Sequence, residues 1–277
     1  MPSGKSSLLG YVYRNFPFDS IVLKGNDVPD FLHRISTNDF EHFTPGNVRK
    51  TLLISEKAKI LDAVWVFNSG NGIEMICGGG MSESVSTWLN KFIIMEDIQT
   101  SIVTGRTVDL YFEEQSSIDY FGIPARFAFN TVPDPSYKIL PDQEYELYRI
   151  SHGIPASQKE LTQEYNPLEL NLWDFISFTK GCYIGQEVIA RLDTYNKVQR
   201  ALCQFSSDGL LNEHSIVIDR ENNEIGKVTS VARTFDRRTV GLAVLKMKSI
   251  ADSRTFHIKD TASDITVENI FQKGSNG

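Results

Sequence analysis

The sequence predicts an α+β protein in which a larger mixed body is followed by a small all-β domain. Two observations lead to this prediction. Apolar, strand-like runs alternate with amphipathic helical segments from residue 18 to about residue 135, and six short β-rich runs separated by charged or Asn/Gly turns occupy residues 198–271. Short strands at this spacing indicate an antiparallel barrel or sandwich. We therefore expect a body over residues 1–196 and a β domain over residues 197–277.

The N-terminal elements follow from their local patterns. FDSIVLK at residues 18–24 is a predicted strand that ends at Gly25. Residues 26–35 are a predicted helix, because Pro29 suits a first helical turn and the apolar residues recur at helical spacing. We expect the inward stripe of this helix to consist of Phe31, Leu32 and Ile35.

The central elements alternate in the same way. Residues 50–67, KTLLISEKAKILDAVWVF, are expected to form two apolar strands joined by a short charged turn. IEMIC at residues 73–77 is a further predicted strand, and residues 82–92 are a predicted helix. Three prolines between residues 132 and 143 interrupt the alternation. Beyond them, two segments over residues 144–178 lead into the most informative stretch of the chain.

Charge and hydropathy exclude several classes of function. Lys and Arg total 28 against 35 Asp and Glu, so the formal net charge is -7. An acidic chain lacks the basic surface that binds a phosphate backbone, which argues against nucleic acid as a partner. No apolar run is long enough to cross a membrane, and the first residues lack the apolar core of a signal peptide. We therefore expect a cytoplasmic protein that spans no membrane.

Cysteine and histidine usage argues against disulfides and metal. Cys77, Cys182 and Cys203 are odd in number and have no CxxC spacing, which is typical of reduced thiols in the cytosol. The five histidines are scattered and form no HxxxH or Cys/His cluster. We therefore expect no dedicated zinc site.

Residues 178–191, FTKGCYIGQEVIAR, have the composition of a site. Gly181 and Gly185 free the backbone for a tight loop, and the residues that follow are helix formers. Cys182 then lies just ahead of a helix N-terminus and beside Lys180. A helix dipole and a nearby cation both favour thiolate over thiol, as in reactive cysteines. The alternative is that the cysteine is a small buried apolar residue and its neighbours are helix-capping residues.

The stretch KGCYIGQE, followed by Arg191, resembles the signature of the YgfZ-type folate-binding proteins. These are relatives of the glycine-cleavage T-protein, an aminomethyltransferase, and include a mitochondrial factor for iron–sulfur cluster assembly. Three further segments, at residues 23–39, 149–155 and 166–172, resemble other segments of the family. Downstream, IGKVTSVA and VGLAVLK resemble strands of the family's C-terminal β-barrel.

The resemblance implies a fold of two intertwined α+β units around a central folate-sized hole, followed by a small antiparallel β-barrel. It also implies tetrahydrofolate, or a derivative, as cofactor. The expected role is the maturation or repair of iron–sulfur enzymes, with those client enzymes or assembly proteins as partners. Within that role the motif cysteine, Cys182, is expected to be the required residue.

Folate has a flat pterin with hydrogen-bond donors, an aromatic linker and an anionic tail, so a binder needs acceptors, apolar walls and cations. Several of the candidate residues have a plain alternative, since aromatic side chains are often core and loop amides often satisfy loop backbone groups. With Cys182 and Asp62 as candidates for the chemistry, the expected cofactor-binding residues are Lys180, Tyr183, Gln186, Glu187, Arg191, Glu169, Asn171 and Arg149.

Two positions depart from the pattern of the T-protein relatives. A glutamate associated with pterin binding is replaced by Ser151, and the second of two successive acids is replaced, so that Asp62 is followed by Ala63. Ala58 also stands where the family has a glycine. These differences favour a folate-dependent accessory factor. The alternatives are an aminomethyltransferase that uses Asp62, and a docking protein whose folate site has degenerated.

Overall fold

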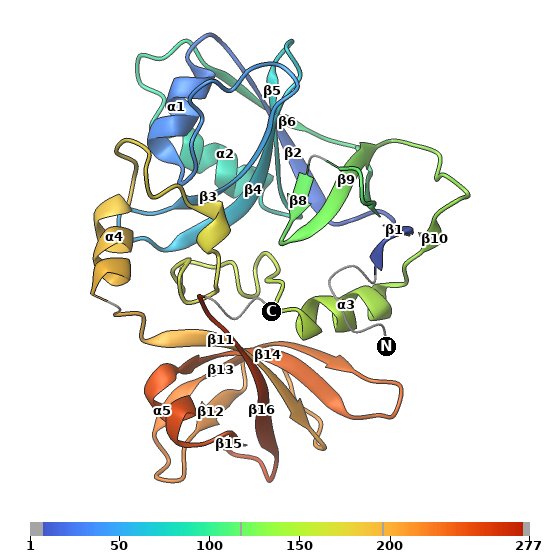
Figure 1. Ribbon diagram of the computed structural model, residues 1–277, viewed down its shortest axis with the longest axis vertical. Helices are drawn as coiled ribbons and strands as arrows, with labels where there is room; N and C mark the ends of the chain where they lie inside the picture. The colour runs from blue at the N-terminus through green and yellow to red at the C-terminus, as the bar shows by residue number, and fades with distance from the viewer. Residues whose placement is uncertain (1–7, 117, 196, 274–277) are drawn as a thin grey trace. The chain divides into compact units, whose positions relative to one another are not determined.

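The computed structural model describes residues 8–116, 118–195 and 197–273. The chain divides into two compact units, one made of Met1–Asp142 and Asp174–Gln186 and the other of Gln143–Trp173 and Glu187–Gly277 (Figure 1). Residues 174–186, which carry most of the motif, therefore fold with the N-terminal half of the chain. The domain boundary at residue 197 stays a prediction.

A five-stranded antiparallel sheet is the main element of the first unit. Three of its strands, at residues 48–54, 60–68 and 73–78, are largely buried because apolar residues run along most of their length, as expected for a sheet covered by other elements. The two strands predicted within residues 50–67 are present and pair with each other as neighbours. In order across the sheet, the strands are β3 (Val48–Ile54), β4 (Ile60–Asn68), β5 (Ile73–Gly78), β2 (Phe18–Lys24) and β6 (Gln99–Val103).

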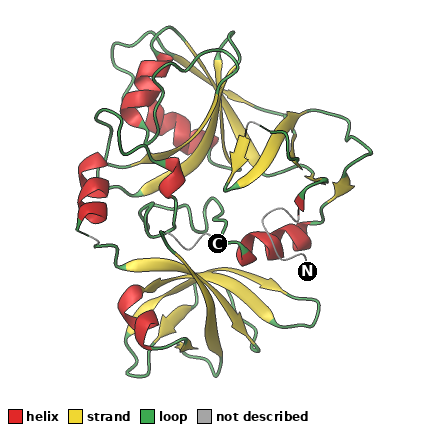
Figure 2. Cartoon of the chain, viewed as in Figure 1, coloured by secondary structure: helices red, strands yellow, loops and turns green. Residues whose placement is uncertain are grey.

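Two helices, α1 (Val28–Ile35) and α2 (Ser82–Asn90), pack against this sheet (Figure 2). The predicted stripe of α1 is buried, and it shares one hydrophobic core with residues of β2, β4 and β5. The amide N–H of Ser82 at the start of α2 donates to the Asp19 carboxylate at 3.0 Å, so an acidic side chain from β2 satisfies this helix end.

A second five-stranded sheet completes the first unit, and aromatic side chains fill the region where it meets the first. Trp65 of β4 stacks on Tyr120 with ring centroids 5.2 Å apart, and its indole N–H donates to the Asp119 carbonyl. In order, the strands of this sheet are β10 (Lys138–Ile139), β1 (Tyr11–Tyr13), β7 (Val108–Phe112), β9 (Ile123–Phe129) and β8 (Ile118–Tyr120).

The second unit contains a closed six-stranded antiparallel barrel, which confirms the predicted β-barrel and decides against a sandwich. The barrel closes because β11 pairs with β16 as well as with β14. In order, its strands are β11 (Arg200–Ser207), β14 (Thr239–Lys246), β13 (Glu224–Arg233), β12 (Ile216–Ile218), β15 (Thr255–Ile258) and β16 (Asp264–Phe271). Further helices in the described part of the chain are α3 (Asp142–Ser151), the 3₁₀ turn η2 (Trp173–Phe175), α4 (Gln186–Thr194) and α5 (Met247–Asp252).

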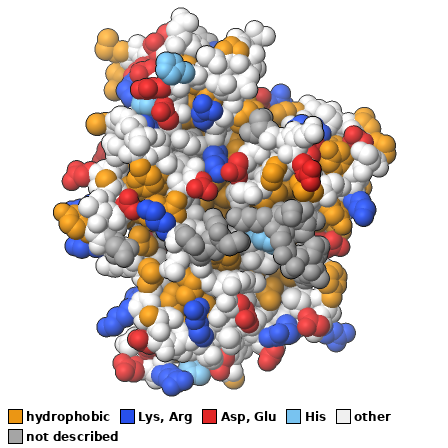
Figure 3. Space-filling view, in the orientation of Figure 1, with side chains coloured by type: hydrophobic (Ala, Val, Ile, Leu, Met, Phe, Trp, Pro, Cys, Tyr) orange, Lys and Arg blue, Asp and Glu red, His pale blue; other side chains and the backbone are white. Residues whose placement is uncertain are grey.

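The surface has no strong bias of charge on the face drawn in Figure 3, where acidic and basic side chains are interspersed. Over the part of the chain that the structure describes, none of the helices has the length and apolarity needed to span a membrane. The compartment in which the protein works stays a prediction.

Candidate functional site

The three cysteines lie in different environments. Cys182 is exposed, whereas Cys77 and Cys203 are buried. Burial raises the pKa of Cys203 to about 12. Burial, and then the negative charges of Asp62 and Asp19, raise the pKa of Cys77 as well, so both interior thiols stay protonated. Cys182 is therefore the cysteine that can meet a partner or reagent from solvent, and the alternative of a buried Cys182 is wrong.

A buried lysine fixes the loop that carries Cys182. The ammonium of Lys180 donates to the carbonyl of His33, to that of Ser36 at 2.9 Å and to that of Asn38 at 2.7 Å. These acceptors belong to the last turn of α1 and the segment after it, where helix carbonyls lack internal partners. Lys180 thus uses all three of its N–H donors to tie the motif loop to α1. Its predicted contact with the cofactor stays a prediction.

Burial also changes the acid–base character of the loop. Burial lowers the pKa of Lys180 to about 8, against the opposing influence of the Asp39 and Glu41 carboxylates. The ammonium lies 5.1 Å from the centroid of the Tyr183 ring, and burial raises the pKa of that phenol to about 12. Lys180 and Tyr183 therefore anchor the loop in the interior. Cys182, which lies between them in the sequence, is exposed at the surface.

The two motif glycines have different reasons to be present. Gly185 has a φ of +79°, and a Cβ there would lie 2.6 Å from the Ser55 carbonyl oxygen. A larger residue would therefore have both an unfavourable backbone conformation and a steric clash. Gly181 is not in the left-handed region, and its Cβ would meet only the imidazole Nε2 of His33, at 3.6 Å. Only Gly185 is required by the backbone of this loop, in contrast to the expectation for both glycines.

His33 is a neighbour of the motif that the sequence did not single out. Its Nδ1 lies 3.2 Å from the Asp39 carboxylate, and its other ring nitrogen faces Gly181. The only signal available in the sequence was that His33 falls outside the apolar stripe of α1, which also leaves it out of the core.

Asp62 lies inside the first sheet. Its side chain is 0% exposed, and its carboxylate accepts a hydrogen bond from the backbone N–H of Gly78 at 2.7 Å. The next residue, Ala63, is also fully buried. The carboxylate therefore has a structural partner on β5, and its catalytic role stays a prediction.

Arg149 belongs to the second unit and lies in a buried ionic network. Its guanidinium is paired with Glu146 and lies 3.5 Å from Glu160, and it donates to the Ser230 hydroxyl at 2.8 Å. Burial opposes the charged form, but the hydrogen bonds that Arg149 donates to Glu146 and the charges of Glu160 and Glu146 outweigh it and raise the pKa of Arg149. This network joins α3 to strand β13 of the barrel.

The other predicted binding residues also lie in or next to the second unit. The Glu169 carboxylate is buried, where it pairs with Arg200 at 2.9 Å and accepts the Asn166 N–H at 3.0 Å. Asn171 has a φ of +58°, which asparagine tolerates better than most residues. The α4 candidates are more open: Gln186 is partly exposed, and Glu187 and Arg191 are exposed. Their roles in binding a cofactor stay predictions.

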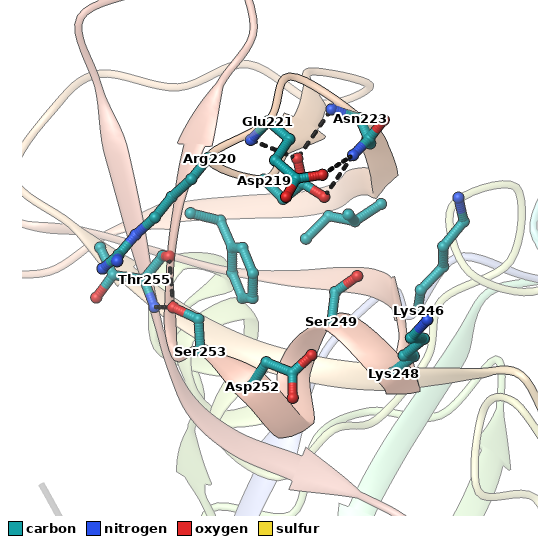
Figure 4. A pocket seen from close by; sticks show the side chains of 12 residues that line it. Asp219, Arg220, Glu221, Asn223, Lys246, Lys248, Ser249, Asp252, Ser253 and Thr255 are labelled. Carbon is teal, nitrogen blue, oxygen red and sulfur yellow. Dashed lines mark hydrogen bonds between the residues drawn. The ribbon is translucent and has the colours of Figure 1, made fainter.

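A cavity of about 630 Å³ lies beside α5 in the barrel, and none of the predicted site residues lines it (Figure 4). Lys246 and Lys248 lie on one side of it and Arg220 on another, and Asp219 is turned toward Asn223, with which it shares hydrogen bonds of 2.9 and 3.1 Å. Its acidic and basic side chains balance each other, so the lining selects no ligand of one charge. Across the described residues, no three His, Cys, Asp or Glu side chains gather as a metal-binding group.

Comparison with known proteins identifies the family. No family model matches the chain. The chain is 43% identical over 236 residues to the tRNA-modifying protein YgfZ of Colwellia psychrerythraea, covering 69% of this chain and 70% of that protein. It is also 32% identical over 131 residues to the mitochondrial iron–sulfur cluster assembly factor IBA57 of Mus musculus, covering 44% of this chain and 35% of that protein.

The fold has a counterpart among solved structures. The glycine cleavage system aminomethyltransferase T of Bartonella henselae superposes with a TM-score of 0.72 at 14% identity, covering 95% of this chain and 86% of that protein. This similarity confirms the predicted T-protein-like α+β architecture with its C-terminal barrel. The extent and identity of the match to YgfZ show that the chain belongs to the YgfZ family.

Proposed function

We propose that this protein is a tetrahydrofolate-binding accessory factor that supports the maturation or repair of iron–sulfur enzymes, and that Cys182 carries its chemistry. The observation on which the proposal depends is the contrast between one exposed cysteine on an anchored loop and two cysteines buried in the interior. The similarity to YgfZ and to an iron–sulfur cluster assembly factor supports the same role.

The anchored loop suits a thiol that must be both accessible and held in place. A free surface cysteine would sample many positions, whereas Lys180 and Gly185 restrict the backbone on either side of Cys182. The burial of Asp62 and its hydrogen bond to Gly78 favour this accessory role over an aminomethyltransferase, whose acid must face the folate. A buried carboxylate that accepts a backbone N–H from the neighbouring strand is better suited to holding β4 and β5 together.

The first prediction concerns the thiol. Cys182→Ser should leave the melting temperature within about 2 °C of the wild type, because an exposed substitution costs roughly 0.5 kcal/mol or less. The variant should nevertheless fail to restore iron–sulfur enzyme activity in a cell that lacks its own YgfZ-type protein, since serine is a poor nucleophile and metal ligand. Thr179→Ala, an exposed change in the same loop, is the matched control and should complement. Complementation by Cys182→Ser would refute the role of the thiol.

The second prediction concerns the cofactor. Tetrahydrofolate at a hundred times its dissociation constant should stabilise the protein by about 2.7 kcal/mol, which is visible as a rise of several degrees in the melting temperature. Thermal melts with and without the ligand measure this rise. The fragment p-aminobenzoylglutamate, which lacks the pterin, is the control and should produce less. If the melting temperature did not change on addition of tetrahydrofolate, the result would instead favour a docking protein whose folate site has degenerated.

A further inference from the structure

Two adjacent apolar side chains, Ile94 and Met95, are displayed on the surface of the first unit. Ile94 is 83% exposed and Met95 is 93% exposed. Phe92 and Ile93 before them, and Ile98 after them, pack against the hydrophobic core of this unit. Single exposed apolar side chains are normal on a protein surface, whereas an adjacent pair with this exposure contributes little to the core and is available to a partner.

The turn that carries the Ile94–Met95 pair is held in place by Glu96. The Glu96 carboxylate accepts hydrogen bonds from the backbone N–H of Ile94 at 2.8 Å and from that of Met95 at 3.1 Å, and it also accepts the Arg34 guanidinium of α1 at 3.1 Å. The bond from the Ile94 N–H, then further bonds from backbone N–H groups and Arg34, lower the pKa of Glu96 to about 2. The carboxylate therefore stays ionised at neutral pH. A turn that is ordered in advance loses less conformational entropy on binding.

Carboxylates predominate around the exposed pair. The N–H of Asp97 donates to the Asp27 carboxylate at 2.8 Å, and Arg34 donates to Asp30 at 2.9 Å, so the turn is joined to α1 and to the residue before it. Acidic side chains also gather over α1 in the upper part of Figure 3, on a face that is otherwise mixed. Four carboxylates and two cations lie on or beside the turn: Asp27, Asp30, Glu96 and Asp97 against Arg34 and Lys91. A complementary surface is therefore basic.

This charge distinguishes between the possible occupants. An apolar tip that enters a membrane is typically flanked by Lys and Arg, which attract anionic headgroups, whereas carboxylates are repelled by them. A symmetric contact between two copies of this chain would bring the same carboxylates face to face. Both occupants are therefore less favourable than a protein of opposite charge.

We propose that the Ile94–Met95 pair is a docking point for a partner protein whose apolar pocket is bordered by lysine and arginine side chains. The two apolar side chains fill the pocket, and the carboxylates around them pair with its border and select against acidic proteins. Methionine is enriched at protein interfaces because its flexible side chain adapts to a pocket. The docking point goes beyond the proposed function and requires neither folate nor the thiol.

A synthetic amphipathic helix of leucine and lysine, labelled with fluorescein, is a probe with an apolar face bordered by cations. Titration with the full chain, followed by fluorescence anisotropy, gives the dissociation constant. The double variant Ile94→Ser, Met95→Ser should raise this constant on the order of tenfold or more, because both apolar anchors are lost. Val132→Ser changes a 90% exposed apolar residue of the same unit and should bind as the wild type does. Melting temperatures check that both variants are folded.

Two further comparisons test the contribution of charge. A helix of leucine and glutamate has the same apolar face with the opposite charge, and it should bind on the order of tenfold more weakly than the lysine helix. Asp30→Asn removes a carboxylate whose side chain is 73% exposed, and it should weaken binding of the lysine helix about twofold to fivefold. This effect should disappear at high salt, where exposed charges are screened.

Several results would overturn the docking point. The proposal is wrong if the wild type does not bind the lysine helix, if the double variant binds it as tightly as the wild type, or if both helices bind equally. Sedimentation with vesicles of phosphatidylglycerol and phosphatidylcholine tests the membrane. Vesicle binding that the double variant loses would assign the pair to a lipid surface in place of a protein. Light scattering tests self-association, and a dimer that the double variant loses would assign the pair to a second copy of this chain.

Discussion

Replacement of Arg149 by methionine should lower the free energy of unfolding by about 3–5 kcal/mol, the usual cost of removing one partner from a buried ion pair. The guanidinium is 2% exposed, and Glu160 beside it is 0% exposed. Methionine fills similar volume but leaves the Glu160 carboxylate without its cation and takes away a donor to the Ser230 hydroxyl. Urea unfolding of the full chain at neutral pH measures the loss.

Two further variants make the Arg149 result specific to buried charge. Adding Glu160→Gln to Arg149→Met should recover part of the lost stability, because the double variant no longer buries an uncompensated carboxylate. Arg238→Met removes a half-exposed arginine that lies 3.4 Å from Asp208, and this exposed pair should be worth about 1 kcal/mol or less. If Arg149→Met cost no more than Arg238→Met, the network would not be an important source of stability.

Much of the fold could be predicted because its elements depend on local patterns. The helix expected over residues 26–35 is observed as Val28–Ile35, with Pro29 in its first turn, and the six β-rich runs after residue 196 coincide with the barrel strands. The closure of the barrel could not be predicted from these runs alone. It depends on pairing between the first and last strands, β11 and β16, and no local signal specifies such a distant partner.

The motif could be recognised in the sequence, but the contacts of its side chains could not be predicted. The spacing of KGCYIGQE indicated an accessible thiol at Cys182, and the thiol is exposed. The acceptors of Lys180 are backbone carbonyls of His33, Ser36 and Asn38, and backbone groups carry no residue-specific signal in a sequence. No signal in the sequence therefore indicated that Lys180 donates to these three carbonyls, and its contact with a cofactor stays a prediction.

The predicted ligand contacts in the second unit show the same limit. Arg149 and Glu169 are charged residues in segments that resemble the family, and a charged side chain in a motif suggests a ligand. Their partners, Glu160 and Arg200, are also charged, and only the fold brings each pair together in the interior. From the sequence alone, a charged residue that binds a ligand cannot be distinguished from one that is paired with an opposite charge inside the protein.

Replacement of Lys180 by methionine should cost about 3 kcal/mol at pH 7, because carbonyls at the end of α1 lose their donor in a buried position. The cost should also depend on pH. Burial lowers the pKa of Lys180 to about 8, below its usual 10.5, so between these values the unfolded chain binds a proton that the folded chain has released. Stability contributed by this group therefore rises with pH across that window.

The difference between wild type and Lys180→Met isolates this contribution, since every other group titrates in both proteins. Urea unfolding at pH 7, 8, 9 and 10 should show the difference widening above about pH 8. Lys57→Met, an exposed change in the same unit, should stay within about 0.5 kcal/mol of the wild type with no such widening. A pH-independent difference would mean that the buried amine keeps its proton, and that the three carbonyls compensate fully for its burial.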